Sequence, residues 1–191
     1  MWQKILRDSS FFLALLLFDR DLAERYRNEG CACGGKLHRA AYLRKPRGEP
    51  FGLPEGFCVR ESFCCCREGC RRRMTPPSLR FLGRRVYLAA TVVLVSAMVH
   101  GITEKRAVAM RELIGVSRRT LHRWRQWWRK SFVRTDYWRA TRARFSLPVD
   151  EQRLPSSLLE RIGKGSEPDR LLVVLELLKP LTPGTRCSVG L

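Results

Sequence analysis

The sequence predicts a mainly α-helical protein with a small β region, a three-helix domain and a helical C-terminal extension. Three observations support this fold class. Apolar residues recur at helical spacing near the N-terminus and through the second half of the chain. Six of the eight cysteines form two clusters in a glycine- and proline-rich segment. The second half is strongly basic, and Pro148 ends its helical pattern. The predicted segments are an N-terminal amphipathic helix (1–30), a cysteine-rich β segment (31–78), a helical domain (79–147), and a helical extension with a loose tail (148–191).

The N-terminal segment is predicted to form an amphipathic helix over residues 10–28. Its apolar positions follow a helical period, charges crowd its later turns, and Gly30 closes it. The apolar positions are Phe11, Leu15, Phe18, Leu22 and Tyr26.

The cysteine-rich segment predicts a metal site. Cys31 and Cys33 precede two glycines, and a second cluster of four cysteines follows about thirty residues later. Zinc takes four thiolate or imidazole ligands in a tetrahedron, and glycines let the backbone approach the sulfurs. A region this poor in apolar side chains would gain its stability from the ion. The expected Zn²⁺ ligands are Cys31, Cys33, Cys65 and Cys70.

Alternative ligands remain open. Only Ala32 separates the first two cysteines, whereas the usual knuckle has two intervening residues, so His38 could replace one of them. In an extended strand Cys64 and Cys66 share one face while Cys65 takes the other, so all three cannot easily hold one ion. The alternatives are therefore His38, Cys64 and Cys66, with Cys58 as a spare ligand and Cys187 incidental.

The cysteine segment resembles the zinc ribbons found at the N-terminal side of many bacterial transposases and transposon-associated proteins. The resemblance covers residues 31–75, in which the second cluster continues into three consecutive arginines. Basic residues that flank a ribbon are expected to hold the phosphate backbone rather than to read bases. These residues are Arg71, Arg72 and Arg73.

Residues 107–127 match the helix-turn-helix template. Gly115 occupies the turn, where left-handed geometry is needed, and Ser117 is a natural N-cap for the second helix. Arg111 stands where the template has a small residue, and residues 84–100 would supply a supporting third helix. The apolar positions that would join the helices are Met110, Ile114, Val116, Leu121 and Trp124.

The second helix, predicted from Arg118 to about Lys130, separates into two faces. Leu121, Trp124 and Trp128 face the core, and a polar stripe lies opposite. Arginine can read guanine and glutamine can read adenine in the major groove, while lysine and outlying arginines hold phosphates. The expected DNA-binding residues of this element are Ser117, Arg118, Arg119, His122, Arg123, Gln126 and Lys130.

The extension is predicted to contain a short helix after Pro155 and a longer one over residues 167–178. Ser166 and Asp169 have capping-box spacing at the start of the longer helix. The tail beyond it is expected to be loose.

The excess of basic residues indicates which kind of molecule the protein binds. The chain has 37 Lys and Arg against 18 Asp and Glu, a net charge of +19. An excess of this size favours a phosphate-rich partner, and double-stranded DNA is the expected one.

Neither apolar run is long enough for a membrane helix. Residues 11–18 and 86–101 are both shorter than the roughly 20 apolar residues that a bilayer requires. We therefore expect no membrane partner and a cytoplasmic, nucleoid-associated location. A reducing cytosol also disfavours a disulfide framework.

The sequence does not predict an enzyme. A three-carboxylate transposase needs a large mixed sheet that holds two metal ions, and only roughly sixty residues follow the predicted helix-turn-helix. A cysteine nucleophile with His38 as base is less well supported than metal ligation. The acidic residues in that remainder have no strand-like runs around them: Asp136, Asp150, Glu151 and Glu160.

The motifs "CGGKLH", "RKPRG" and "CRRRMTPPS" are together similar to short bacterial insertion-sequence proteins. This resemblance implies recognition of transposon DNA or of a nearby promoter, without catalysis. A separate transposase or self-association would supply the protein partner. The alternative function is that of an RNA-binding or assembly protein. In that case the basic ribbon would bind phosphate groups while Trp127 or Trp138 stacks on bases.

Overall fold

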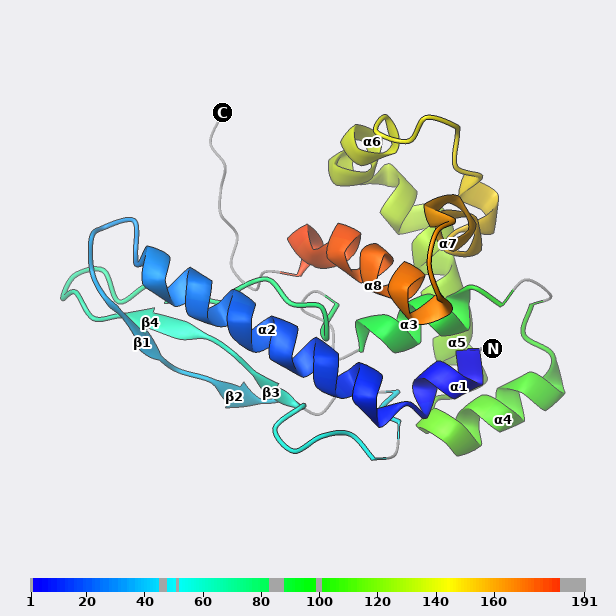
Figure 1. The fold of residues 1–191 in the computed structure, drawn as a ribbon, viewed down its shortest axis with the longest axis horizontal. Coiled ribbons are helices and arrows are strands. Elements are labelled where there is room, and N and C mark those ends of the chain that lie inside the picture. The colour runs from blue at the N-terminus through cyan, green and yellow to red at the C-terminus, as the bar shows by residue number, and fades with distance from the viewer. Residues whose placement is uncertain (1, 45–47, 51, 83–87, 99–100, 183–191) are drawn as a thin grey trace.

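The computed structural model describes residues 2–44, 48–50, 52–82, 88–98 and 101–182. A long N-terminal helix lies along a small antiparallel sheet at one end of the molecule, and the remaining helices gather at the other end (Figure 1). The predicted mainly helical fold with a small β region is confirmed.

Two helices form the N-terminal segment. The long helix α2 (Ser9–Glu29) begins at Asp8, whose carboxylate accepts the backbone N–H groups of Ser10 and Phe11 at 3.0 and 3.2 Å. It ends at Gly30, which has a positive φ of 75°. The short helix α1 (Trp2–Leu6), which was not predicted, packs against helix α3 of the other half.

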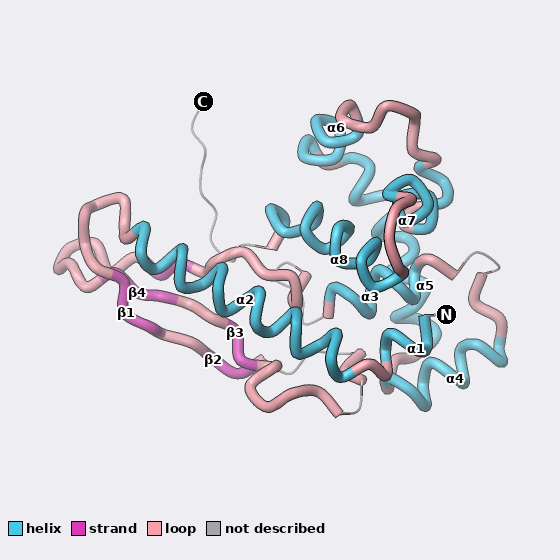
Figure 2. The backbone as a smooth tube through the Cα atoms, viewed as in Figure 1, coloured by secondary structure: helices cyan, strands magenta, loops and turns pink. Residues whose placement is uncertain are grey.

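In the described part of the chain, five short strands form two antiparallel sheets, and Figure 2 shows where the strands lie. Strand β4 (Phe63–Cys65) is the centre of the larger sheet, between β1 (Leu37–Arg39) and β5 (Arg73–Met74). Strands β2 (Tyr42–Leu43) and β3 (Val59–Arg60) pair separately.

The larger sheet packs against α2 through a small apolar cluster. Tyr26 of α2 stacks over Phe63 of β4, with ring centroids 6.5 Å apart. Ala23, Leu37 and Cys65 also belong to this cluster, together with Met74 and the other clustered cysteines, and it is separate from the main core. So few apolar side chains contribute little burial energy, and the sheet therefore needs another source of stability.

The second half is built around one buried helix, α3 (Ala89–Ser96), all of whose residues are buried. The prediction placed a longer helix over residues 84–100, of which 84–87 and 99–100 lie outside the described residues. Helices α4 (Glu104–Ile114) and α5 (Arg118–Gln126) follow, and all five predicted apolar positions of this pair are buried. Helix α5 packs on both α3 and α4.

The helical path continues beyond α5 but changes its winding. Residues Trp127–Ser131 form a π-helical turn, η1, where the sequence predicted a regular helix to about Lys130. A 3₁₀ turn, η2 (Phe132–Arg134), and helix α6 (Asp136–Arg142) follow.

The C-terminal extension packs into the main core. It contains η3 (Glu151–Arg153), α7 (Ser156–Ile162), α8 (Glu167–Leu178) and η4 (Lys179–Leu181). Helix α8 has the predicted bounds and the predicted capping box of Ser166 and Asp169. It packs against α3 and α7, so one cluster of buried side chains runs from α1 to α8.

Among the described residues, no helix combines the length and the apolar character that crossing a membrane would require.

Candidate metal centre and candidate nucleic-acid interface

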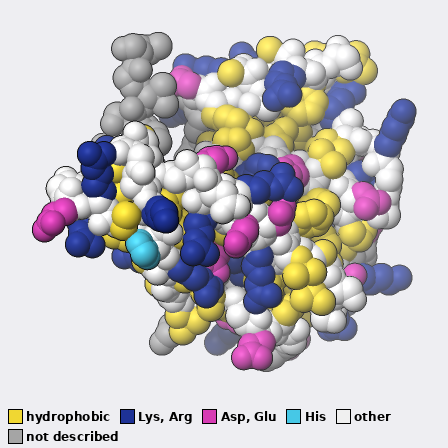
Figure 3. All heavy atoms as spheres, turned by 60° about the vertical axis from the view of Figure 1, so that its left-hand side comes forward, with side chains coloured by type: hydrophobic (Ala, Val, Ile, Leu, Met, Phe, Trp, Pro, Cys, Tyr) yellow, Lys and Arg dark blue, Asp and Glu magenta, His cyan; other side chains and the backbone are white. Residues whose placement is uncertain are grey.

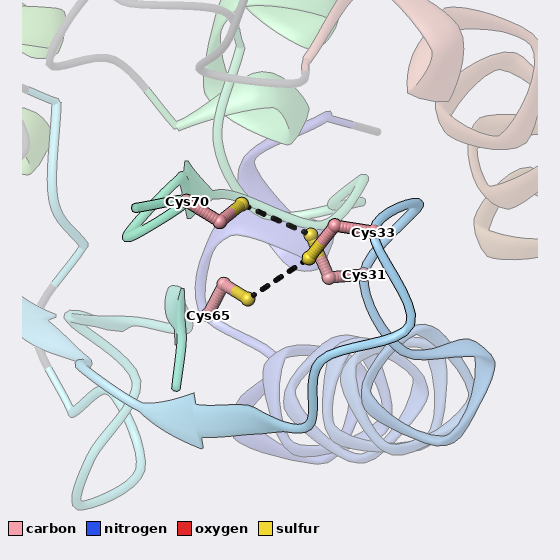
Figure 4. Close-up of side chains that lie close together, drawn as sticks. All are labelled: Cys31, Cys33, Cys65 and Cys70. Carbon is pink, nitrogen blue, oxygen red and sulfur yellow. Dashed lines mark hydrogen bonds between the residues drawn. The ribbon is translucent and has the colours of Figure 1, made fainter. Parts of the chain in front are cut away.

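Four cysteine sulfurs converge where the end of α2 meets the sheet (Figure 4). The ligand atoms of Cys31, Cys33, Cys65 and Cys70 all lie within 4.8 Å of one another. The sulfurs of Cys31 and Cys70 are 3.8 Å apart, and those of Cys33 and Cys65 are 3.5 Å apart. Four sulfurs at about 2.3 Å from a central zinc would be about 3.8 Å from one another. The cluster can therefore hold a metal ion.

A tight turn after α2 brings the first two cysteines together. The N–H of Gly34 donates to the carbonyl of Cys31 at 2.7 Å, and the N–H of Cys31 donates to the carbonyl of Gly35 at 3.0 Å. A Cβ at Gly35 would lie 2.5 Å from the Cys65 sulfur, so no larger residue fits there without a shift. The single-residue spacing thus does not prevent both thiols from facing one point.

The second pair comes from β4 and the turn that follows it. Cys65 is the last residue of the strand, and its sulfur accepts the backbone N–H of Arg67 at 3.4 Å. The N–H of Cys70 donates to the carbonyl of Arg67 at 3.1 Å, which closes the turn. Arg71 leaves this turn with a φ of 39°, in the left-handed region.

Two of the four thiols, Cys33 and Cys65, differ in pKa. The backbone N–H of Gly35 and the neighbouring thiols lower the pKa of Cys33 to about 6. For Cys65 the N–H of Arg67 acts to lower the pKa, but burial and the neighbouring thiols together raise it to about 12. Cys33 is therefore the more acidic of these two thiols, and four adjacent thiolates would need a bound cation to offset their mutual repulsion.

The alternative ligands lie outside the cluster. His38 is exposed on β1 opposite Cys64, whose thiol donates to the carbonyl of Arg71 at 3.5 Å. Cys66 is exposed. Cys58 donates to the Glu49 carboxylate at 3.3 Å, and burial, followed by Glu49, raises the pKa of its thiol to about 12. Cys187 is outside the described residues.

The three arginines after the cluster have different surroundings. All three are exposed. Arg73 donates to the hydroxyl of Ser62 and to the carbonyl of Ala40, both at 3.1 Å. Arg73 therefore supports the sheet, while Arg71 and Arg72 present their side chains to solvent. Figure 3 shows that Lys and Arg side chains on the face it displays are interspersed with Asp, Glu and apolar side chains.

Helices α4 and α5 are joined by a short capped turn. Gly115 ends α4 in the left-handed conformation, with φ 64°, and its N–H donates to the carbonyl of Arg111 at 2.9 Å. Two residues later, the Ser117 hydroxyl accepts the N–H of Thr120 and begins α5.

The two faces of α5 separate as the sequence predicted. Leu121, Trp124 and Trp128 are buried. The opposite stripe borders a hollow of about 490 Å³ beside the residues that precede α4. The predicted residues on its lining are Arg119, His122, Arg123, Gln126 and Lys130.

Two predicted residues lie at the start of α5, and two arginines that were not predicted line the hollow. Arg118 pairs with Glu104 at 2.7 Å in an exposed contact. The Ser117 hydroxyl accepts the N–H of Thr120 as the N-cap of α5. Arg125 and Arg129 also line the hollow. A regular helical period places both toward the flanks of the stripe, so the sequence alone gave no strong signal for them.

The structure corrects one prediction about aromatic side chains. Trp138 is fully buried, and its indole N–H donates to the Glu151 carboxylate at 2.8 Å, so it cannot stack on a base. Trp127 is half-buried against Trp128 and Phe132, with ring centroids 4.9 and 5.4 Å away.

Comparison of the chain with protein-family models, with curated proteins and with solved structures found no match. The geometry of the two candidate sites is therefore the basis for functional inference.

Proposed function

We propose that the protein is a zinc-stabilised, sequence-specific DNA-binding protein. In this proposal the cysteine segment is a zinc ribbon, and α4, the turn and α5 form a helix-turn-helix supported by α3. The biological role would be that of a bacterial transposon-associated accessory factor or transcriptional regulator at the nucleoid, without its own catalytic domain. A separate transposase or a second copy would be its protein partner.

The choice of zinc rests on the ligand set. Four cysteine sulfurs within 4.8 Å of one another suit Zn²⁺ better than the hard cations, which prefer oxygen ligands. The small sheet also lacks a large apolar core of its own, so a structural ion accounts for its stability.

The observation that carries the DNA proposal is the polarity of α5. A buried apolar face fixes the helix on α3 and α4, while the exposed face presents arginine, histidine and glutamine together. Guanidinium and amide groups on one exposed helix face are the donors and acceptors that match base edges in the major groove. The net charge of +19 supplies attraction to phosphate.

Selection from a random duplex library tests the proposal. Zinc-loaded full-length protein should enrich a defined sequence, and affinity for that sequence should exceed affinity for random DNA by orders of magnitude. Enrichment of no sequence, together with equal or better binding to single-stranded RNA, would favour the RNA alternative.

A further inference from the structure

Three arginines outside the predicted stripe lie near one point beside α5. Arg106 of α4 donates to the carbonyl of Gly101 at 3.2 Å. A Cβ built on Gly101 would lie 3.7 Å from a terminal guanidinium nitrogen of Arg125. Arg129 follows Arg125 by one turn and lines the same hollow. The guanidinium groups of Arg106 and Arg125, from α4 and α5, therefore lie near one backbone position, and the charges of both Arg106 and Arg129 act on Arg125.

No ion pair among the described residues compensates this positive charge. The described lining of the hollow contains no Asp or Glu. None of the ion pairs among the described residues involves Arg106, Arg125 or Arg129. Burial, followed by Arg129 and Arg106, lowers the pKa of Arg125. A partly buried guanidinium held beside two others is unfavourable in the free protein, and a bound anion would relieve that cost.

We propose that this hollow is a phosphate-group site, in which Arg125 is the central ligand and Arg106 and Arg129 flank it. Arginine suits such a group because its planar donors bind two phosphate oxygens at once. The assignment of the phosphate to the backbone of duplex DNA rests on the proposed function.

The position of the site gives it a distinct role. Arg119 and Gln126, the expected base-reading residues, line the same hollow. A backbone phosphate held by Arg125 would lie next to the groove that these residues enter. Phosphate contacts of this kind set the register of a protein on the duplex without specifying sequence. The site would thus position α5 for reading.

The salt dependence of Arg125→Gln tests the site. The experiment uses full-length zinc-loaded protein, a selected duplex and a random duplex, between about 50 and 200 mM salt. Loss of one phosphate contact should reduce the steepness of log affinity plotted against log salt concentration by about 0.9. It should also weaken binding to both duplexes by about tenfold. The melting temperature should not fall, because the change removes a crowded cation. Arg139→Gln is the matched control, since Arg139 is exposed on α6 and pairs with Asp136.

The outcomes separate this inference from the proposed function. If Arg125→Gln leaves the salt dependence of binding unchanged while Arg119→Ala abolishes sequence preference, the phosphate site alone is overturned and the proposed function stands. Single-stranded RNA is the third probe: if Arg125→Gln weakens binding to this RNA and leaves binding to both duplexes unchanged, the duplex assignment is overturned. If the wild type binds no duplex, but inorganic phosphate shifts the NMR resonance of the Arg125 Nε–H, the phosphate site is supported and the proposed function fails. If neither duplex DNA nor inorganic phosphate shifts the NMR resonance of the Arg125 Nε–H, the phosphate site is overturned.

Discussion

Asp19 and Arg80 form a buried ion pair that joins the N-terminal helix to the segment after the sheet. The Asp19 carboxylate is 2.8 Å from the Arg80 Nε, and the side chains are 2% and 1% exposed. The same carboxylate accepts the backbone N–H of Leu79 at 2.6 Å and the hydroxyl of Ser78. Arg80 also donates to the carbonyl of Val59 at 3.1 Å. The pair thus connects α2, strand β3 of the smaller sheet and the chain leading into the helical half.

Replacement of Asp19 by Asn should destabilise the whole fold. It would leave the Arg80 guanidinium buried without a counter-charge, which costs about 3–5 kcal/mol. Urea denaturation followed by far-ultraviolet circular dichroism measures this loss. Asp21→Asn is the control, because its pair with Arg25 is largely exposed and should contribute less than about 1 kcal/mol. Equal losses for the two variants would contradict a structural role for the buried pair.

Purified under reducing conditions, the protein should contain one zinc per chain. Cys70→Ala should release the metal and disorder the turns and larger sheet that surround it, because that region has only a small apolar cluster. The helical half should remain folded, since its core is separate. Elemental analysis and NMR measure the two effects, and Cys66→Ala should retain the ion because Cys66 is exposed outside the cluster. Fresh reduced protein without stoichiometric metal would refute the metal centre.

Zinc affinity should rise with pH. Near neutral pH the Cys33 thiol, with a pKa of about 6, is already ionised, whereas Cys65, with a pKa of about 12, must release its proton to the solvent when zinc binds. Lower pH therefore favours the protonated, metal-free form. Competition with a chromophoric chelator at several pH values measures the dependence, and a pH-independent affinity would argue against thiolate ligation.

Truncation of the exposed stripe should reduce sequence preference without unfolding the protein. Arg119→Ala and Gln126→Ala should each cost roughly 1 to 3 kcal/mol on the selected duplex and much less on random DNA. Leu121→Ala should instead destabilise the domain by about 2–5 kcal/mol and weaken both kinds of binding, because Leu121 is fully buried. Thermal melting and fluorescence anisotropy distinguish the two classes. Full site preference in both stripe variants would disprove base reading by α5.

The arginines after the cysteine turn should not act as a set. Combined replacement of Arg71 and Arg72 by Ala should weaken binding to all duplexes alike, because basic residues that flank a ribbon are expected to hold the phosphate backbone rather than to read bases. Arg73→Ala should also reduce the stability of the sheet, since it removes the hydrogen bonds to Ser62 and Ala40. Loss of affinity on one sequence only would reassign Arg71 and Arg72 to base contacts.

Local patterns in the sequence were sufficient to predict several elements. Helix α8 could be bounded from its capping pair, and the α4–α5 turn from Gly115 and Ser117, because caps and left-handed turns depend on neighbouring residues. Helical periodicity likewise predicted the buried and exposed faces of α5.

Only the tertiary structure decided which cysteines share a centre and which arginines lie close together. Three consecutive cysteines offer similar chemistry, and the choice of Cys65 over Cys64 and Cys66 depends on strand pairing and on a turn that begins thirty residues earlier. The convergence of Arg106 with Arg125, and the pairing of Asp19 with Arg80, join elements that are distant in sequence or separated by a turn. Such contacts depend on how elements pack against one another, and sequence periodicity describes each element alone.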